Sequence, residues 1–200
     1  MLAVLLFGGI MIRKFIETDK QIFIDMCMDF YSGEGVDHSI PIEYASTTFD
    51  KLLKSSPFCE AYLYEDNGIV YGYVLLSFTY SNESGGDVVW IEELYTAPTA
   101  RGRGIASSLL KYVLDCYKHY SRFRLEVTEN NQGAIRLYER NGFKQLNYLQ
   151  MEILKQKGRF KRPFILLNCF FESQCNCCSF IENTVYIYFR IMKYSAVFYN

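Results

Sequence analysis

The chain has 200 residues, half of them apolar, and a formal net charge of −1. This profile predicts one globular domain with a hydrophobic core. A near-neutral chain cannot by itself collect many phosphate contacts, and its longest basic cluster, KQKGRFKR at 155–162, is typical of a solvated boundary, so nucleic acid is excluded as the default partner.

The first ten residues, MLAVLLFGGI, are apolar but carry no basic n-region and no small-residue cleavage site, and they are too few to span a bilayer. We interpret residues 1–10 as an N-terminal extension ahead of the folded domain. The expected compartment is the cytoplasm, with no membrane partner.

A strand and two helices are expected first. MIRKFIE (11–17) is a strand candidate, and Thr18 with Gln21 matches a capping box that predicts a helix start. The apolar spacing carries this helix to the breaker YSGEG at 31–35. A second helix is expected from about 42 to 54. Its candidate core residues are Tyr44, Phe49, Leu52 and Leu53.

The middle of the chain changes to the period of strands. EAYLYEDNGIVYGYVLLSFTY (60–80) predicts two strands around Asp66-Asn67-Gly68, because Asn and Gly tolerate the positive φ of a hairpin turn. VVWIEELYT (88–96), rich in β-branched and aromatic residues, predicts a third antiparallel strand.

Helices and strands then alternate. A helix with one apolar face begins at Ile105, the alternation of RFRLEVT (122–128) predicts a strand, and a helix over 131–140 ends at Asn141-Gly142. FKQLNYLQMEIL (143–154) is expected to supply the closing strand. This order predicts an α/β (α+β) fold, a mixed sheet with helices on its faces.

The glycine-rich turn between strand and helix indicates an anion site. Gly102 and Gly104 alternate with Arg101 and Arg103 at a helix start, where free backbone N–H groups and the helix dipole favour negative charge. A P-loop is disfavoured, since no lysine followed by serine or threonine stands in this turn, and a dinucleotide motif is disfavoured by Ser107 and by the preceding antiparallel strands. We expect a pyrophosphate-sized anion here.

Two motifs together resemble one family. Residues 101–106, RGRGIA, resemble the R/Q-x-x-G-x-G/A acetyl-CoA motif of the GNAT superfamily of N-acetyltransferases. Residues 131–143, NQGAIRLYERNGF, resemble its N-x-x-A-x-x-L-Y-x-x-x-G-F segment. The resemblance covers about residues 11–156 and implies the GNAT-like acyl-CoA N-acyltransferase fold, in which VVWIEELYT and RFRLEVT are parallel strands that splay apart.

The resemblance also implies a site for acetyl-CoA as co-substrate, with no metal. Backbone groups of 94–96 would pair with the pantetheine arm, the amides of 101–107 would hold the pyrophosphate, and Asn131 and Tyr138 would contact the pantetheine and lie near the thioester sulfur. The implied residues are Leu94, Tyr95, Thr96, Arg101, Gly102, Arg103, Gly104, Ile105, Ala106, Ser107, Asn131 and Tyr138. Asn131 as a plain N-cap and Tyr138 as a core aromatic are the structural alternatives.

Transfer to an amine needs a route for the amine proton, a stabiliser for the oxyanion and an acid for the leaving thiolate. The motif makes Tyr138 the candidate acid. Glu92 and Glu93 are the candidate bases, and strand alternation lets at most one face the cleft unless a bulge intervenes. We favour Glu92, because IEELY resembles the acidic pair of the polyamine acetyltransferases; a rim charge, an ion pair and a water relay are the alternatives.

The acceptor amine is expected to be bound by the first pair of helices and the hairpin loops, where FYSGEGVDHSIPIEY (30–44) offers candidate residues. An acidic, aromatic lining would suit a cationic amine, and an ordinary solvated loop is the alternative. The candidate lining residues are Glu34, Asp37, His38, Glu43 and Tyr44.

Seven cysteines do not predict a metal site. Cys27, Cys59 and Cys116 stand in apolar surroundings typical of buried thiols. Four more lie in the tail without paired C-x-x-C spacing and accompanying histidines. These four are Cys169, Cys175, Cys177 and Cys178. We interpret residues 157–200 as an extension without selected structure, with a dimerisation or membrane-surface element as the alternatives.

The sequence thus predicts a domain over 11–156 that moves an acetyl group from acetyl-CoA directly to a primary amine of a small molecule or protein. The alternative is a catalytically silent acyl-CoA-binding regulatory module of the same fold. An amine acceptor is the expected partner, and a homodimer is left open.

Overall fold

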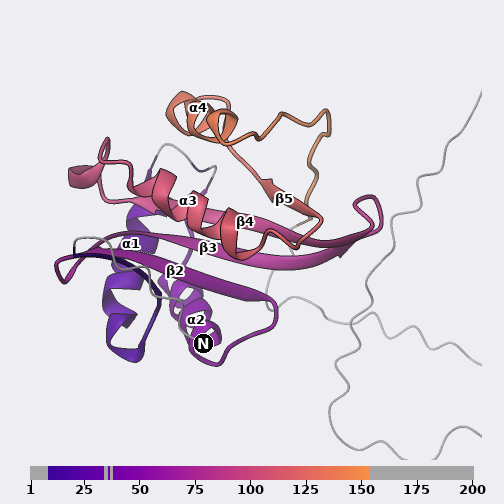
Figure 1. Ribbon diagram of the computed structural model, residues 1–200. Helices are drawn as coiled ribbons and strands as arrows, with labels where there is room; N and C mark the ends of the chain where they lie inside the picture. The colour runs from indigo at the N-terminus through magenta and orange to yellow at the C-terminus, as the bar shows by residue number, and fades with distance from the viewer. Residues whose placement is uncertain (1–8, 34–35, 37, 154–200) are drawn as a thin grey trace, which may run out of the picture. The chain divides into compact units, whose positions relative to one another are not determined.

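The computed structural model describes residues 9–33, 36 and 38–153. It divides into two compact units, Met1–Tyr148 and Leu149–Asn200. The described helices and strands all belong to the first unit, and residues 149–153 of the second form neither helix nor strand. Figure 1 shows the elements of the first unit.

A five-stranded mixed sheet is the centre of this unit, with the order β1-β2-β3-β4-β5. The first four strands are antiparallel, and β4 and β5 are parallel, which confirms the predicted fold class. The strands are β1 (Ile10–Lys14), β2 (Cys59–Asp66), β3 (Ile69–Ser81), β4 (Gly86–Thr96) and β5 (Arg122–Leu125).

Helices cover both faces of the sheet (Figure 1). Helices α1 (Lys20–Ser32) and α2 (Ile42–Leu53) lie on one face, whereas α3 (Ile105–Cys116) and α4 (Gln132–Arg140) lie on the other. Short 3-10 turns, η1 (Glu17–Asp19) and η2 (Pro98–Ala100), precede α1 and α3.

Each face of the sheet has its own hydrophobic core. Strand β3 contributes side chains to both cores, because successive side chains of a strand point to opposite faces. Tyr73 and Leu75 of β3 belong to the α1/α2 core, whereas Val74 and Leu76 belong to the α3 core. The α1/α2 core includes Phe23, Phe49, Leu63 and Tyr73. The α3 core includes Val74, Leu76, Val89, Leu109 and Val113. All nine of these side chains are fully buried.

The buried stripe of α2 differs from the one expected. Ala45 and Phe49 are buried and Leu52 packs against the α1/α2 core, but Tyr44 and Leu53 are exposed. Residues 45, 49 and 52 follow the four- and three-residue spacing of one helix face, and Tyr44 and Leu53 fall beside that face.

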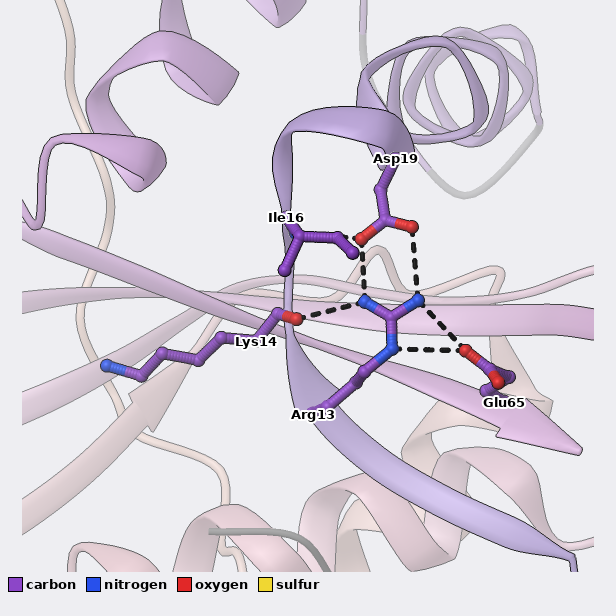
Figure 2. A network of polar contacts seen from close by, with 5 residues as sticks. All are labelled: Arg13, Lys14, Ile16, Asp19 and Glu65. Carbon is purple, nitrogen blue, oxygen red and sulfur yellow. Dashed lines mark hydrogen bonds and ion pairs between the residues drawn. The ribbon is translucent and has the colours of Figure 1, made fainter. Parts of the chain in front are cut away.

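The expected capping box at Thr18 is wrong. The turn η1 comes first, α1 begins at Lys20, and the Gln21 amide donates to Asp25 instead of reaching back to the helix start. Asp19 receives the guanidinium of Arg13 and accepts a 2.8 Å bond from the Ile16 N–H (Figure 2). This half-buried network sets the geometry of the helix entrance, and sequence periodicity does not reveal it.

Arg13 of β1 links the start of α1 to β2 through two carboxylates. Its guanidinium contacts Asp19 at 2.6 Å and Glu65 of β2 at 2.9 Å, and both partners are largely buried (Figure 2). Their hydrogen bonds and charges raise the pKa of Arg13 against the opposing effect of burial. Strand β1 and the start of α1 are therefore fixed to β2 by one charged network.

Two predicted turns are confirmed. Asn67 and Gly68 both have positive φ, 50° and 80°, as the two-residue hairpin between β2 and β3 requires. Gly142 follows α4 with φ 87°, and the Phe143 N–H donates to the Tyr138 carbonyl, which is a left-handed helix end.

The expected closing strand is wrong for its described part. Residues 143–153 form no strand, and Leu146, Tyr148, Leu149 and Met151 are exposed. Strand period is not sufficient, because a strand also needs a neighbour with which to hydrogen-bond. The edge strand β5 offers only four residues for such pairing.

Among the helices of the described residues, none combines the length and apolar character needed to cross a membrane.

Candidate functional site

A β-bulge in β4 determines how the candidate acids are placed. Leu75 of β3 pairs with Glu93, whereas the next residue, Leu76, pairs with Ile91, so Glu92 is an extra residue in β4. Before the bulge, Ile91 belongs to the α3 core; after it, Tyr95, another odd-numbered residue, belongs to the α1/α2 core. The extra residue has reversed the alternation of the strand.

Both acids line one cavity on the α1/α2 face. The cavity has a volume of about 310 Å³, and Glu92 and Glu93 contribute to its wall. The bulge thus removes the argument from strand alternation that at most one of them can face the cleft. Tyr31 at the end of α1 and Thr48 and Lys51 on α2 also line the cavity.

Glu93 is buried and engaged by two phenols. Its side chain accepts a 2.9 Å hydrogen bond from Tyr31 and another from Tyr73, and the residue is only 5 % exposed. Burial raises the pKa of Glu93, the bonds from Tyr73 and Tyr31 lower it in part, and the charge of Glu92 raises it again, with a net rise. Burial also raises the pKa of the neighbouring Cys27 thiol to about 12.

Glu92 has a different environment from its neighbour. It is exposed, and one of its carboxylate oxygens accepts a hydrogen bond from the Ser77 hydroxyl on β3. Its other oxygen can therefore accept a proton or a ligand N–H at the cavity.

Strands β4 and β5 separate at the bulge. Their pairing runs from Val88–Arg122 to Ile91–Leu125, where β5 ends, while β4 continues to Thr96. Beyond Ile91, the edge of β4 that faces away from β3 has no strand partner in the described part of the chain. Leu94, Tyr95 and Thr96, predicted to hold a strand-like arm by their backbones, lie on this open edge.

The buried surroundings of the open edge contain an unused polar group. The Thr96 hydroxyl is buried and has no hydrogen-bond partner among the described residues. On the other side of β4, Gly72 of β3 packs so closely that a Cβ there would clash with the Tyr95 carbonyl and touch Ile105. Gly72 therefore lets β3, β4 and the start of α3 approach one another.

The glycine-rich turn has the geometry of an anion site. Gly102 and Gly104 have φ of 78° and 80°, Gly104 is the N-cap of α3, and a Cβ on either would face open space. The N–H groups of Ile105, Ala106 and Ser107 belong to the first turn of α3, where helix geometry provides no intrahelical acceptor. The backbone donors and the open space in front of them suit a phosphate.

The two arginines of this turn are placed differently. Arg103 lies 3.3 Å from Asp66 and stacks over the Tyr71 ring at 4.7 Å, so its side chain is directed toward the β2–β3 hairpin. Arg101 is exposed. The backbone N–H of Arg103 donates a long turn bond of 3.4 Å to the Ala100 carbonyl, and that of Arg101 donates one of 3.4 Å to the Pro98 carbonyl.

Asn131 and Tyr138 occupy the start and the body of α4. Asn131 is the N-cap, because its Oδ1 accepts a 3.1 Å bond from the Ala134 N–H, and its side-chain NH₂ is a further donor group. Tyr138 packs against the α3 core and against the Phe143 ring at 5.9 Å. Burial raises the pKa of Tyr138 to about 12, so its hydroxyl keeps its proton at neutral pH.

Of the loop residues expected to line the acceptor site, those that the structure describes do not line this cavity. His38, Glu43 and Tyr44 are exposed and outside its wall, and Glu34 and Asp37 lie outside the described residues. The sequence interpretation missed Tyr31, Lys51 and Ser77. Tyr31 stands at the breaker that ends α1, and no local signal shows that it reaches β4.

The cysteines are only partly as expected. Cys27 is buried, but Cys59 and Cys116 are half-buried, and Cys59 lines the cavity. Cys169, Cys175, Cys177 and Cys178 lie outside the described residues. Within the part that the structure describes, no three His, Cys, Asp or Glu side chains cluster as metal ligands would.

Comparison with known proteins finds relatives that are named as N-acetyltransferases. The chain is 29 % identical over 145 residues to thialysine N-epsilon-acetyltransferase of Mus musculus, which covers 68 % of this chain and 84 % of that enzyme. It is 30 % identical over 95 residues to spermine/spermidine N(1)-acetyltransferase of Bacillus subtilis, covering 42 % of this chain and 62 % of that enzyme.

Solved structures share the fold. An aminoglycoside N-acetyltransferase in complex with CoA superposes with a TM-score of 0.62 over 77 % of this chain and all of its own, at 16 % identity. The model of the acetyltransferase (GNAT) family matches residues 23–143. With this match over more than half of its length, the chain belongs to the acetyltransferase (GNAT) family.

Proposed function

We propose that the protein is an acetyl-CoA-dependent N-acetyltransferase that moves the acetyl group directly to a primary amine of a small molecule. One observation carries the proposal. Because of the bulge at Glu92, both Glu92 and Glu93 line one cavity at the point where β4 and β5 separate. A donor that enters between the strands and an amine that enters from the α1/α2 face would meet there.

Acetyl-CoA is proposed to bind along the open edge of β4 and on the glycine-rich turn. The backbone of Leu94, Tyr95 and Thr96 would pair with the pantetheine arm, and the pyrophosphate would receive the N–H groups of the turn and of the first turn of α3. The residues proposed for the pyrophosphate are Arg101, Gly102, Arg103, Gly104, Ile105, Ala106 and Ser107. The CoA complex of a protein with the same fold supports this choice of ligand.

Glu92 is the group proposed to take the proton from the amine. It is exposed at the cavity and has one carboxylate oxygen without a hydrogen-bond partner among the described residues, whereas both oxygens of Glu93 already accept bonds from Tyr31 and Tyr73. An alkyl amine is protonated at neutral pH and must lose a proton before it attacks. Glu93 would hold the bulge and add negative charge that attracts the cationic amine.

Tyr138 is the group proposed to protonate the leaving thiolate, since it keeps its own proton at neutral pH. Asn131 would donate from its free NH₂ group to the pantetheine arm. The names of the relatives, which act on thialysine or on spermine and spermidine, support an amine acceptor.

The test is acetyl-CoA turnover by the full chain with polyamines, amino acids, aminoglycosides and peptides as acceptors. Release of CoA with an acetylated amine would support the proposal. Tight acetyl-CoA binding without turnover on any amine, and no effect of Tyr138→Phe, would instead identify a catalytically silent acyl-CoA-binding module.

A further inference from the structure

Glu92, the residue proposed to take the amine proton, lacks the support that its neighbours have in the sheet. The residues on either side of it, Ile91 and Glu93, each have a register partner in β3, whereas Glu92 has none. Strand β5 provides none either, because its pairing with β4 ends at Ile91. As the extra residue of a β-bulge, Glu92 is therefore not held by the register of the sheet.

The side chain of Glu92 is held by one hydroxyl group. Ser77 of β3 donates its hydroxyl hydrogen to Oε1 of Glu92. Within the described part of the chain, no other hydrogen bond or ion pair includes this carboxylate. Ser77 is half-buried and lines the same cavity. The long and exposed side chain of Glu92 thus depends on Ser77 for a fixed orientation.

The position of Ser77 in β3 explains how its hydroxyl reaches the bulge. Tyr73 and Leu75 belong to the α1/α2 core, so strand alternation places Ser77 on the same face of the sheet. Its register partner in β4 is Trp90, two residues before Glu92. The hydroxyl therefore lies one strand away from the bulge, on the face from which the amine is proposed to enter.

The two acids of the bulge are bound by their hydroxyl partners in different ways. Glu93 is buried and accepts bonds from Tyr31 and Tyr73 with both of its oxygens. Glu92 accepts a bond from Ser77 with Oε1 alone, which leaves Oε2 without a partner among the described residues. A carboxylate that is fixed through one oxygen presents the other in a defined direction, as a general base requires.

We propose that Ser77 is a positioning residue for Glu92, and that its hydroxyl holds Oε1 so that Oε2 takes the proton of the acceptor amine. This inference rests on the proposed N-acetyltransferase function. The hydroxyl keeps its own hydrogen, and a new O–H bond forms at Oε2 as the N–H bond of the ammonium breaks. Without the hydroxyl, the carboxylate would adopt several orientations, and only some of them would direct an oxygen to the amine.

The test compares Ser77→Ala and Ser77→Thr in steady-state turnover of acetyl-CoA with an amine that the wild-type chain acetylates. Ser77→Ala is expected to lower kcat about tenfold or more and to change KM for the amine by less than about twofold, because a misplaced base slows the reaction without weakening binding. Ser77→Thr keeps the hydroxyl and should keep most of the wild-type kcat.

Ser81→Ala is the matched control. It removes a serine hydroxyl from the same strand and the same face, at a residue that does not line the cavity, so kcat should stay at the wild-type value. Circular dichroism and thermal unfolding verify that all variants are folded.

A double-mutant cycle separates positioning from direct binding of the amine. In a Glu92→Ala background, Ser77→Ala should change kcat by less than about twofold, since no carboxylate remains to be positioned. A hydroxyl that bound the amine itself would instead raise KM and would keep its effect in this background, which would contradict the inference.

Three results would overturn the inference and leave the N-acetyltransferase function standing: an unchanged kcat in Ser77→Ala, an equal loss of kcat in Ser77→Ala and Ser77→Thr, or the same effect of Ser77→Ala with and without Glu92. Absence of turnover on every amine offered would overturn the proposed function and this inference with it.

Discussion

The hydroxyl of Tyr31, in the last turn of α1, donates a 2.9 Å hydrogen bond to Glu93 in the bulge of β4. A second bond joins the same two elements, from the Tyr95 hydroxyl to Asp29 at 2.6 Å. The end of α1 is therefore tied to the part of β4 that lines the cavity. The cavity wall formed by α1 depends on phenol–carboxylate bonds as well as on apolar packing.

Tyr31→Phe should loosen this wall. We expect a higher KM for the amine with a smaller change in kcat, and a loss of about 1 kcal/mol in the free energy of unfolding, typical of one hydrogen bond. Steady-state kinetics and urea denaturation measure the two effects. Tyr80→Phe, on an exposed part of β3, is the control. An unchanged KM would mean that the bond does not shape the acceptor site.

Glu93→Gln should change how stability depends on pH. The folded-state pKa of Glu93 is raised above its unfolded value, so the native state binds this proton more tightly. The protonated Glu93 therefore adds to the free energy of unfolding, fully below the unfolded pKa of about 4.3, and this addition is lost as pH rises through the folded pKa. In Glu93→Gln, which has no carboxyl group at this position, the free energy of unfolding should not show this decrease.

Urea denaturation in steps from acid to neutral pH measures the slope of the unfolding free energy for wild type and Glu93→Gln. Glu129→Gln, at an exposed position, should keep the wild-type slope. Equal slopes in wild type and Glu93→Gln would show that Glu93 has no raised pKa.

Gly104→Asp should weaken acetyl-CoA binding at least about tenfold, or 1.4 kcal/mol, by placing a carboxylate beside the pyrophosphate. Gly104→Asn is the matched control, because Asn has the same shape without the charge and tolerates the positive φ of this position. Calorimetric titration with acetyl-CoA compares the variants. Equal affinities of the folded Asp and Asn variants would place the phosphate site elsewhere.

Tyr138→Phe should lower kcat by about 100-fold or more, the usual contribution of a general acid, while acetyl-CoA affinity stays near the wild-type value. The ring packing against Phe143 is retained, so thermal unfolding should change little. If kcat is unchanged, Tyr138 is a core aromatic and another donor serves the thiolate.

The parts of the fold encoded locally were predictable. Asn67-Gly68 and Gly142 require positive φ, and their turns formed where expected. Both GNAT motifs lie at a helix start or on a helix, as the resemblance implied. Two expectations failed. The capping box of Thr18 and Gln21 did not form, and the start of α1 is instead held by Arg13, which binds both Asp19 and the distant Glu65. The strand expected after Gly142 did not form in its described part, where no neighbouring strand pairs with it.

The candidate site was predictable in its residue types but not in its arrangement. Glu92 and Glu93 could be selected from their position in the strand. The bulge that lets both line one cavity is seen only in the pairing of β4 with β3. Lys51 and Tyr31 carry no local signal, because their role depends on how α1 and α2 pack on the sheet.

The bulge at Glu92 also affects how this strand can be compared between proteins. Because one added residue exchanges the faces of everything after it, Leu94 contacts the α3 core and Tyr95 the α1/α2 core. Deleting Glu92 would rotate both side chains to the other layer without changing either residue. An ungapped alignment with a strand that lacks the bulge would therefore equate positions that face opposite layers, so substitution patterns in this strand carry meaning only once residue 92 is treated as an insertion.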